Sequence, residues 1–344
     1  MDRQLAQRNI LSLTVNELVN RLPPLVRQTI PSHLLTKPSL FLAQRLQSMG
    51  CQQEATTVLH LLVQAEPVNT EALYRLGLAY NRIGNRVEAS KYIRRHYEQR
   101  MRANGMDPLF NVDTLQYLLS TEGFAAPPVQ VPQAYVENLF DRFSDHFDER
   151  LLNQLTYKAP KLLCEVFCNV AKGEKAYEGC KELVDLGCGT GLAGKYFQAI
   201  CATLTGVDIS SEMIEKARLR GIYDELIVNE IMAYLGSVAL PIDIFIATDV
   251  FNYFGEMEPI LAACRNRQGV GGLLAFSVET LETTSANEQV GFKLASSGRF
   301  QHERHYVLTS AVNAGYQLMT CAERVLRHED GLDVQGYLFV LKAA

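Results

Sequence analysis

A short apolar run that leads directly into closely spaced glycines constrains the fold of this chain more than any other feature. Residues 182–186 read ELVDL, and Gly187, Gly189 and Gly191 follow before a helical pattern begins. A strand that enters a glycine-rich turn and then a helix brings free backbone N–H groups close to a ligand. The segment therefore predicts an α/β fold that binds an adenosine cofactor at the end of its first strand.

Two glycine patterns overlap in this loop, and they predict different cofactors. Residues 189–194 read GTGLAG, a literal match to the dinucleotide fingerprint G-x-G-x-x-G. The predicted strand ends at Leu186, so this match begins two residues too late for the turn. Asp185 would be unfavourable beside a pyrophosphate, whereas it suits a cofactor that carries positive charge. The pattern favours a cationic adenosine cofactor, and an NAD-dependent oxidoreductase is kept as an alternative.

Strands and helices alternate after the loop. Five strand-like runs in βα order predict a parallel, doubly wound sheet, and they are ELVDL, TLTGVD ending at Asp208, DELIV, IDIFIATD and GGLLAFSVE. Serines before residue 212 and Gly221 after the run predict the two ends of one intervening helix. A helix near 306–314 and two runs joined by a turn at 329–331 predict an antiparallel hairpin at the sheet edge.

The N-terminal part is helical and repeats itself. Residues 36–69 align with residues 70–103 at an offset of 34, which places Ala43 on Gly77 and Gly50 on Gly84. Small residues allow two helices to approach closely, and the second glycine pair supplies the turn between them. This pattern resembles the tetratricopeptide repeat (TPR). Because two repeats are few for a free-standing solenoid, we expect flanking helices over 11–30 and 108–119 to cover them.

These patterns divide the chain into two predicted domains. Residues 1–120 form a helical TPR-like domain, and the proline-rich segment 121–133 is a linker. Residues 134–344 form the α/β domain, with a helical lid at 134–170. An aromatic stripe that includes Phe143 and Phe147 recurs at helical spacing in this lid, where it serves either as core or as a cover for the cofactor cleft.

Charge and composition exclude several function classes. The chain of 344 residues has a formal net charge of −5 and no block of like charge, which argues against a nucleic-acid partner. No apolar segment is long enough to span a bilayer and no apolar signal core begins the chain, so we expect a cytoplasmic protein without membrane association. The eight cysteines lack a C-x-x-C pair, which predicts reduced thiols and no metal site.

The α/β part resembles the class I S-adenosylmethionine-dependent methyltransferases. ELVDLGCGTG is similar to their first motif and GVDIS to their second. The chain resembles more narrowly the bacterial methyltransferases that carry N-terminal TPR repeats, through YVENLFDRFSDHFDERL, LTYKAP, ATDVFNYFG, AFSVE, SGRFQHERHYV and VLRHEDGLDVQGYLFVL. The resemblance implies a Rossmann-like seven-stranded sheet with one antiparallel strand, and S-adenosyl-L-methionine as the cofactor.

The resemblance also implies a set of cofactor-binding residues. They are Asp185, Gly187, Cys188, Gly189, Gly191, Asp208, Ile209, Met213, Glu230, Ile231 and Thr248. Within this set Asp208 would hold the ribose, and Ile209 and Met213 would flank the adenine. Asn229-Glu230 departs from the usual Ala-Asp pair, and the longer side chain puts the geometry of its hydrogen bond to the adenine amine in question.

Other residues are candidates for the side of the methyl acceptor. His302, Tyr253 and Asp249 are candidate bases, and a base is needed only if the acceptor must first lose a proton. A carboxylate acceptor would need none. Contacts to the substrate or the lid are expected from Tyr135, Phe143, Tyr157, Asn252, Arg299 and Tyr306. The alternative for Arg299, His302 and Tyr306 is a loop held by hydrogen bonds before a helix.

The sequence thus predicts a methyltransferase that acts on an O- or N-acceptor of a small metabolite or a peptide-like substrate. The TPR-like repeats would recognise the substrate or a protein partner. The alternative is a TPR scaffold protein with a cofactor-sensing or degenerate methyltransferase domain, although the intact Asp185, glycines and Asp208 argue against decay. The sequence identifies neither the acceptor nor the oligomeric state.

Overall fold

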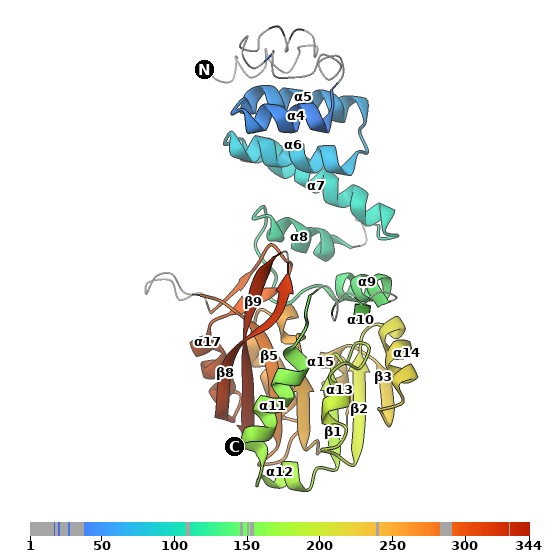
Figure 1. Ribbon diagram of the computed structural model, residues 1–344, viewed down its shortest axis with the longest axis vertical. Coiled ribbons are helices and arrows are strands. Elements are labelled where there is room, and N and C mark those ends of the chain that lie inside the picture. The colour runs from blue at the N-terminus through green and yellow to red at the C-terminus, as the bar shows by residue number, and fades with distance from the viewer. Residues whose placement is uncertain are drawn as a thin grey trace. The chain divides into compact units, whose positions relative to one another are not determined.

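The computed structural model divides the chain into two compact units, Met1–Ala126 and Pro127–Ala344 (Figure 1). We call them the helical unit and the sheet unit. The structure describes residues 38–107, 111–144, 147–149, 151, 155–238, 241–282, 291–329 and 331–344, together with the single positions 17, 20 and 27. The expected flanking helix over 11–30 and the first two residues of the first repeat lie outside these ranges, apart from those single positions.

The helical unit contains two helix–turn–helix pairs at the places that the 34-residue offset predicts. Its helices are α4 (Leu40–Ser48), α5 (Gln52–Ala65), α6 (Thr70–Arg82), α7 (Arg86–Ala103) and α8 (Val112–Thr121). Ser39, Asn69 and Asn85 cap the N-termini of α4, α6 and α7 by accepting a backbone N–H in the first turn. The turns contain Gly50 and Gly84, which both have positive φ.

Close packing between α6 and α7 explains why one repeat position is small. A Cβ atom built on Gly77 would lie 2.7 Å from the side chain of Ile93 and 3.2 Å from its backbone nitrogen. Leu76 and Ile93 are both fully buried. The two helices therefore approach each other at a distance that only glycine allows at this position.

The sheet unit corrects the expectation of seven strands, because the sheet formed by its described residues has nine. The strands are β1 (Glu182–Leu186), β2 (Thr203–Asp208), β3 (Glu225–Val228), β4 (Ile244–Ala247), β5 (Leu273–Thr280), β6 (Phe292–Leu294), β7 (Phe300–His302), β8 (Tyr316–Glu329) and β9 (Leu332–Ala343). The helices are α9 (Gln133–Phe143), α10 (Phe147–Glu149), α11 (Ala159–Ala171), α12 (Lys175–Glu178), α13 (Gly194–Phe197), α14 (Ser211–Arg220), α15 (Ile231–Ser237), α16 (Met257–Arg265) and α17 (Arg304–Asn313), with a 3₁₀ turn η4 (Phe251–Tyr253).

Seven of the nine strands form one continuous sheet with a single antiparallel strand, and the other two form an added hairpin. The order is β3-β2-β1-β4-β5-β9-β8, and β9 runs antiparallel to both of its neighbours. The hairpin of β6 and β7 attaches where β7 pairs with Glu279 and Thr280 at the end of β5. Each of its strands has three residues, which is too short for the alternation of apolar and polar residues to reveal from sequence.

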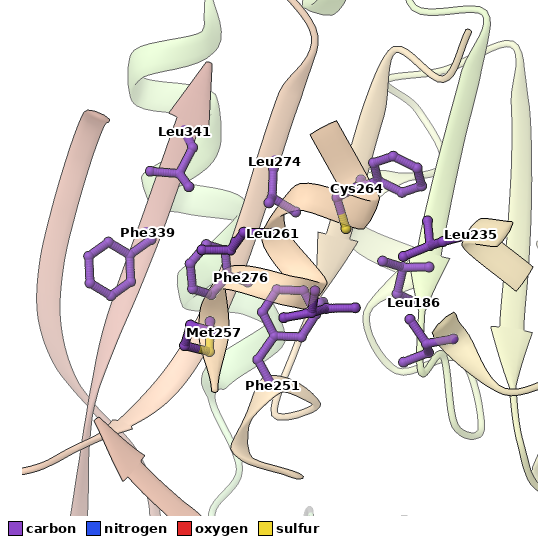
Figure 2. Close-up of a cluster of buried hydrophobic side chains, with 14 of the residues drawn as sticks. Leu186, Leu235, Phe251, Met257, Leu261, Cys264, Leu274, Phe276, Phe339 and Leu341 are labelled. Carbon is purple, nitrogen blue, oxygen red and sulfur yellow. The ribbon is translucent and has the colours of Figure 1, made fainter. Parts of the chain in front are cut away.

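Apolar side chains cover both faces of the central strands, as a parallel sheet requires. Val184 and Leu186 of β1 belong to a cluster with α15, α16 and α17, whereas Leu183 belongs to a cluster with α11 and α13. Figure 2 shows the first cluster around Phe276 of β5. Two acids, Asp185 and Asp208, lie at the carboxyl ends of β1 and β2. No helix within the described ranges is both long enough and apolar enough to cross a membrane.

Replacing Gly77 with valine should destabilise the helical unit, because the added side chain would overlap Ile93. We expect the free energy of unfolding to fall by about 1–3 kcal/mol, as is usual for overpacking, measured by urea denaturation with circular dichroism. Asn81→Val is the control, since Asn81 is exposed on the same helix. Equal effects of the two substitutions would contradict the close approach of α6 and α7.

Candidate functional site

A cavity of about 400 Å³ lies at the carboxyl ends of β1, β2 and β4, and all of its lining residues belong to the sheet unit. The lid-side helix α9 contributes apolar and aromatic side chains, among them Tyr135, Phe140 and Phe143. The strands and loops contribute the polar residues. A mainly apolar pocket with a few convergent polar groups at the carboxyl edge of a parallel sheet is the usual form of a small-molecule site.

The glycine loop is held against β2 by its own backbone. The N–H groups of Gly187 and Cys188 both donate to the carbonyl oxygen of Val207, at 2.7 and 3.0 Å. Gly187 has φ 67°, and a Cβ there would lie 2.4 Å from Val250 Cγ2. Only glycine satisfies both the conformation and the space at this position.

Asp208 fastens the next part of the loop. Its Oδ2 accepts the N–H of Gly189 at 2.8 Å, and its Oδ1 accepts the N–H of Ser210 at 2.9 Å. Burial raises the pKa of Asp208 to about 6, although these backbone hydrogen bonds oppose the increase. The carboxylate thereby fixes the loop and the start of α14 while it faces the cavity.

Asp185 is the more exceptional acid. It is 1% exposed, and among the described residues its side chain accepts one hydrogen bond, from the Tyr223 hydroxyl to Oδ2 at 2.7 Å. Burial raises the pKa of Asp185 to about 7, the bond to Tyr223 lowers it, and the charge of Asp208 raises it. A buried carboxylate in a cavity wall with so little compensation is stabilised by a cationic ligand.

Tyr223 is a site residue that sequence reasoning missed. A Cβ on Gly194 would lie 2.5 Å from its hydroxyl oxygen, and one on Gly191 would lie 2.9 Å from its Cε2. The last glycine of the apparent dinucleotide fingerprint therefore makes room for Tyr223. The contact joins Asp185 to a residue 38 positions away, and no local sequence pattern signals it.

A set of polar contacts, which we call the lid clasp, joins α9 and α10 to the cofactor edge of the sheet. Ser210 Oγ donates to Asp141 on α9. Asp148 on α10 accepts from the Thr190 hydroxyl and from Arg220 at the end of α14. Hydrogen bonds thus connect α9 and α10 to α14 and to the glycine loop.

A second group of charged residues gathers at the cavity, and we call Asp249, Glu279, Arg299, Arg327 and Glu329 the charged cluster. Arg327 donates to Asp249 Oδ2 at 2.8 Å, to Glu329 at 3.2 Å and to Glu279. Arg299 donates through Nε to Glu279 at 2.6 Å and through Nη2 to Glu329. All except Glu279 line the cavity.

Asp249 is held rigidly within this cluster. Its backbone has φ 57°, an unusual conformation for a residue other than glycine and one that is common at functional sites. Its N–H donates to Ser277 Oγ at 2.7 Å, and the same hydroxyl donates to Asp249 Oδ1 at 3.0 Å. With Oδ2 bonded to Arg327, both carboxylate oxygens are engaged.

Most of the residues predicted for the site lie together in this cavity. Its lining includes Tyr135, Phe143, Tyr157, Asp185, Gly187, Cys188, Gly189, Asp208, Ile209, Glu230, Ile231, Thr248, Asp249, Tyr253 and Arg299. Gly191, Met213, Asn252, His302 and Tyr306 are not part of it. Gly191 lies beside Tyr223, and Met213 is fully buried within α14.

The structure corrects the expectation that His302 lies beside the acceptor. Its ring is fully buried, and Nε2 contacts the carbonyl oxygens of Phe254 and Gly255 at 2.9 and 3.2 Å. Burial lowers the pKa of His302 to about 4, so the ring is neutral and joins β7 to the loop after η4. Asn252 and Tyr306 similarly accept backbone N–H groups, from Glu279 and Met257. The contacts of His302 and Tyr306 are those expected for a loop held by hydrogen bonds, whereas Arg299 lines the cavity.

Comparison with known families identifies the region around the loop. Residues 184–276 match the family model described as "Methyltransferase domain". The matched stretch contains the glycine loop, Asp208 and Asp249. This region is therefore similar to methyltransferase domains, and the match supports S-adenosylmethionine as the cofactor. No curated protein sequence matches the chain.

Several solved structures are similar at low sequence identity. The magnesium protoporphyrin IX methyltransferase of Synechocystis PCC 6803, crystallised with bound SAM, is 14% identical with a TM-score of 0.46, and the match covers 62% of this chain and 97% of that one. An S-adenosylmethionine-dependent methyltransferase from Clostridium acetobutylicum ATCC 824 is 13% identical with a TM-score of 0.43, covering 60% and 99%. The cyclase SpnF is 14% identical with a TM-score of 0.49, covering 63% and 97%.

The raised pKa of Asp185 has a consequence for stability without ligand. Its pKa is about 7 in the folded protein and about 3.9 when unfolded, so its contribution is fully present below pH 4 and is lost as the pH rises through 7. We expect Asp185→Asn to gain stability relative to the unchanged protein between pH 5 and 8, by a few kcal/mol. Urea denaturation across this range measures the difference. The control is Asp113→Asn, which changes an exposed residue on α8. If the free energy of unfolding of Asp185→Asn changed with pH in parallel with that of the unchanged protein, the burial argument would be contradicted.

Proposed function

We propose that this protein is an S-adenosylmethionine-dependent methyltransferase that acts on an O- or N-acceptor of a small metabolite or a peptide-like substrate. The observation that carries the proposal is Asp185. It is a buried carboxylate in the cavity wall with one side-chain hydrogen bond, and it lies within the matched methyltransferase domain. A cavity built for a pyrophosphate would not place a carboxylate there, because the two negative charges would repel each other.

The residues around the glycine loop fit the chemistry of this cofactor. Asp185 would pair with the ammonium group of its methionine part. Asp208 already accepts one backbone N–H at each oxygen, and each carboxylate oxygen can accept a second bond. Asp208 can therefore also accept the two ribose hydroxyl protons. Asp185 on β1 would then bind the ammonium group, and Asp208 on the adjacent strand β2 would bind the ribose.

The adenine end of the proposed site is formed by Ile209, Glu230 and Ile231, which line the cavity. Glu230 Oε2 caps α15 by accepting the N–H of Ala233 at 2.8 Å. Its Oε1 accepts no bond from the residues that the structure describes, and it would accept the adenine amine. The cap fixes the longer side chain of glutamate, which addresses the departure from the usual Ala-Asp pair.

Bound S-adenosylmethionine supplies a methyl group activated by a sulfonium. The protein must orient the acceptor in line with that methyl group and exclude water. Thr248, Asp249 and Tyr253 follow β4 and line the cavity, so they would contact the acceptor. Phe140 packs edge-on against both Phe147 and Tyr253, and this aromatic cover would keep water from the reacting atoms.

We further propose that the helical unit consists of TPR-like repeats that recognise the substrate or a protein partner. Support comes from the 34-residue offset and from the helix pairs whose turns lie at Gly50 and Gly84. We also propose a cytoplasmic location for the protein. Its eight free cysteines support this location, because reduced thiols are typical of the cytosol.

Calorimetric titration with S-adenosylhomocysteine tests the proposed cofactor. We expect binding to tighten as the pH rises from 5 to 7, approaching tenfold per pH unit at the lower end, because Asp185 must lose its proton to pair with the ammonium group. Asp185→Asn should bind much more weakly and lose this dependence above pH 6, while Asp113→Asn should behave as the unchanged protein. Failure to bind, or tighter binding of NAD, would overturn the proposal. Asp185→Ala should likewise abolish methyl transfer.

The lid clasp should slow the release of the cofactor product. Asp148→Ala removes the acceptor of both Thr190 and Arg220, and we expect S-adenosylhomocysteine to dissociate about two- to fivefold faster, as fits a partly exposed charged contact. A competition experiment measures this rate. Glu137→Ala on the exposed side of α9 is the matched control, and an unchanged rate in Asp148→Ala would show that the clasp does not retain the ligand.

A further inference from the structure

The candidate bases near the acceptor are all ion-paired or protonated. Both oxygens of Asp249 are bonded, to Arg327 and to Ser277. Burial raises the pKa of Tyr253 to about 12 and that of Tyr157 well above its ordinary value. Burial would raise the pKa of Glu329 as well, but Arg299 and Arg327 more than offset it, so this carboxylate is a weak base. No histidine or lysine is found in the described part of the cavity wall.

Hydrogen-bond donors, in contrast, are available at the same place. The hydroxyl groups of Tyr157 and Tyr253 line the cavity and make no hydrogen bond to the residues that the structure describes. Arg299 uses Nε and Nη2 within the charged cluster, which leaves both protons of Nη1. Tyr157 lines the same cavity as Asp185, Asp249 and Arg327, and all three contribute to the shift of its pKa.

The charge balance of the cluster decides between acceptor classes. Three acids surround two guanidinium groups, so an amine acceptor would be held there as an ammonium ion. An ammonium ion has no lone pair for attack, and its deprotonation needs a base. Asp185 and Asp208 are assigned to the cofactor in the proposed function, and Asp249 and Glu329 are ion-paired with the arginines of the cluster. A hydroxyl acceptor meets the same difficulty. A carboxylate needs no deprotonation, and the unused O–H and N–H donors match its two oxygens.

We propose that the methyl acceptor is a carboxylate, held by Tyr157, Tyr253 and Arg299, and that the product is a methyl ester. This inference rests on the proposed methyltransferase function. One carboxylate oxygen of the acceptor forms a bond to the methyl carbon with its lone pair, while the bond between that carbon and the sulfonium sulfur breaks. The sulfur keeps the bonding electrons, and no proton is released. The products are the methyl ester and S-adenosylhomocysteine.

A calorimetric titration of the protein saturated with S-adenosylhomocysteine tests the acceptor class. Hexanoate, benzoate and phenylacetate are compared with hexylamine, benzylamine and benzyl alcohol. We expect the carboxylates to bind more tightly than the amines or the alcohol, because their two oxygens accept from the unused O–H and N–H donors. The affinity for carboxylates should fall about tenfold in Tyr253→Phe, which removes one hydrogen bond to a charged group without disturbing the fold. Tyr157→Phe and Arg299→Gln should act in the same direction.

The matched control is Tyr196→Phe on α13, outside the cavity lining, which should bind the carboxylates as the unchanged protein does. The inference is overturned if none of the carboxylates binds, if an amine binds more tightly, or if Tyr253→Phe has no effect. Saturation with S-adenosylhomocysteine is measured first, so a failure at that step counts against the cofactor and a failure at the second step counts against the carboxylate alone.

Methyl transfer to the same six compounds gives a second readout. With methyl-tritiated S-adenosylmethionine, an ester releases volatile methanol in mild base, whereas a methylated amine or an ether does not. Volatile counts from a carboxylate support the proposal, and base-stable counts from an amine or the alcohol overturn it.

Discussion

Two carboxylates buried at the ends of adjacent strands determine how the cavity is built. Asp208 holds the glycine loop and the start of α14 by accepting backbone N–H groups, and Asp185 faces the cavity with a single partner from Tyr223. Parallel pairing of β1 and β2 brings these strand ends together, and the charge of Asp208 raises the pKa of Asp185. A cationic ligand opposes this increase, which connects the packing of the sheet to the identity of the cofactor.

The acceptor end depends instead on the antiparallel hairpin. Arg327 and Glu329 come from β8, Glu279 from β5 and Arg299 from the loop before β7. Pairing of β9 with both β5 and β8 carries β8 alongside the sheet, and its last residues reach the cavity. The resulting ion pairs leave Asp249 fully engaged and leave hydroxyl and guanidinium donors for a substrate. The fold topology therefore explains why Asp249 and Glu329 are ion-paired, and why hydroxyl and guanidinium donors near them are free to bind a substrate.

The sequence predicted features that depend on residues close together in the chain better than features that depend on residues far apart in it. Helix ends such as Ser210 and Gly221 were predicted because capping is local, and the helix pairs of the N-terminal part followed from a repeat of fixed length. The glycine loop and the strand ends followed from patterns within a few residues. His302 was misplaced, because a motif position does not show that the ring turns toward Phe254 and Gly255. The β6–β7 hairpin was missed because its strands are too short to show a period.

The sequence by itself determined the α/β class, the order of the main strands and the preference for a cationic adenosine cofactor, since these follow from apolar periodicity, glycine spacing and the sign of one charge. Tertiary structure alone decided which partners surround those residues. It placed Tyr223 against Asp185, fastened Asp148 to Arg220 and set Arg327 between three acids. These contacts join residues between 2 and 78 positions apart, and most of them become neighbours only when the sheet and its helices close around the cavity.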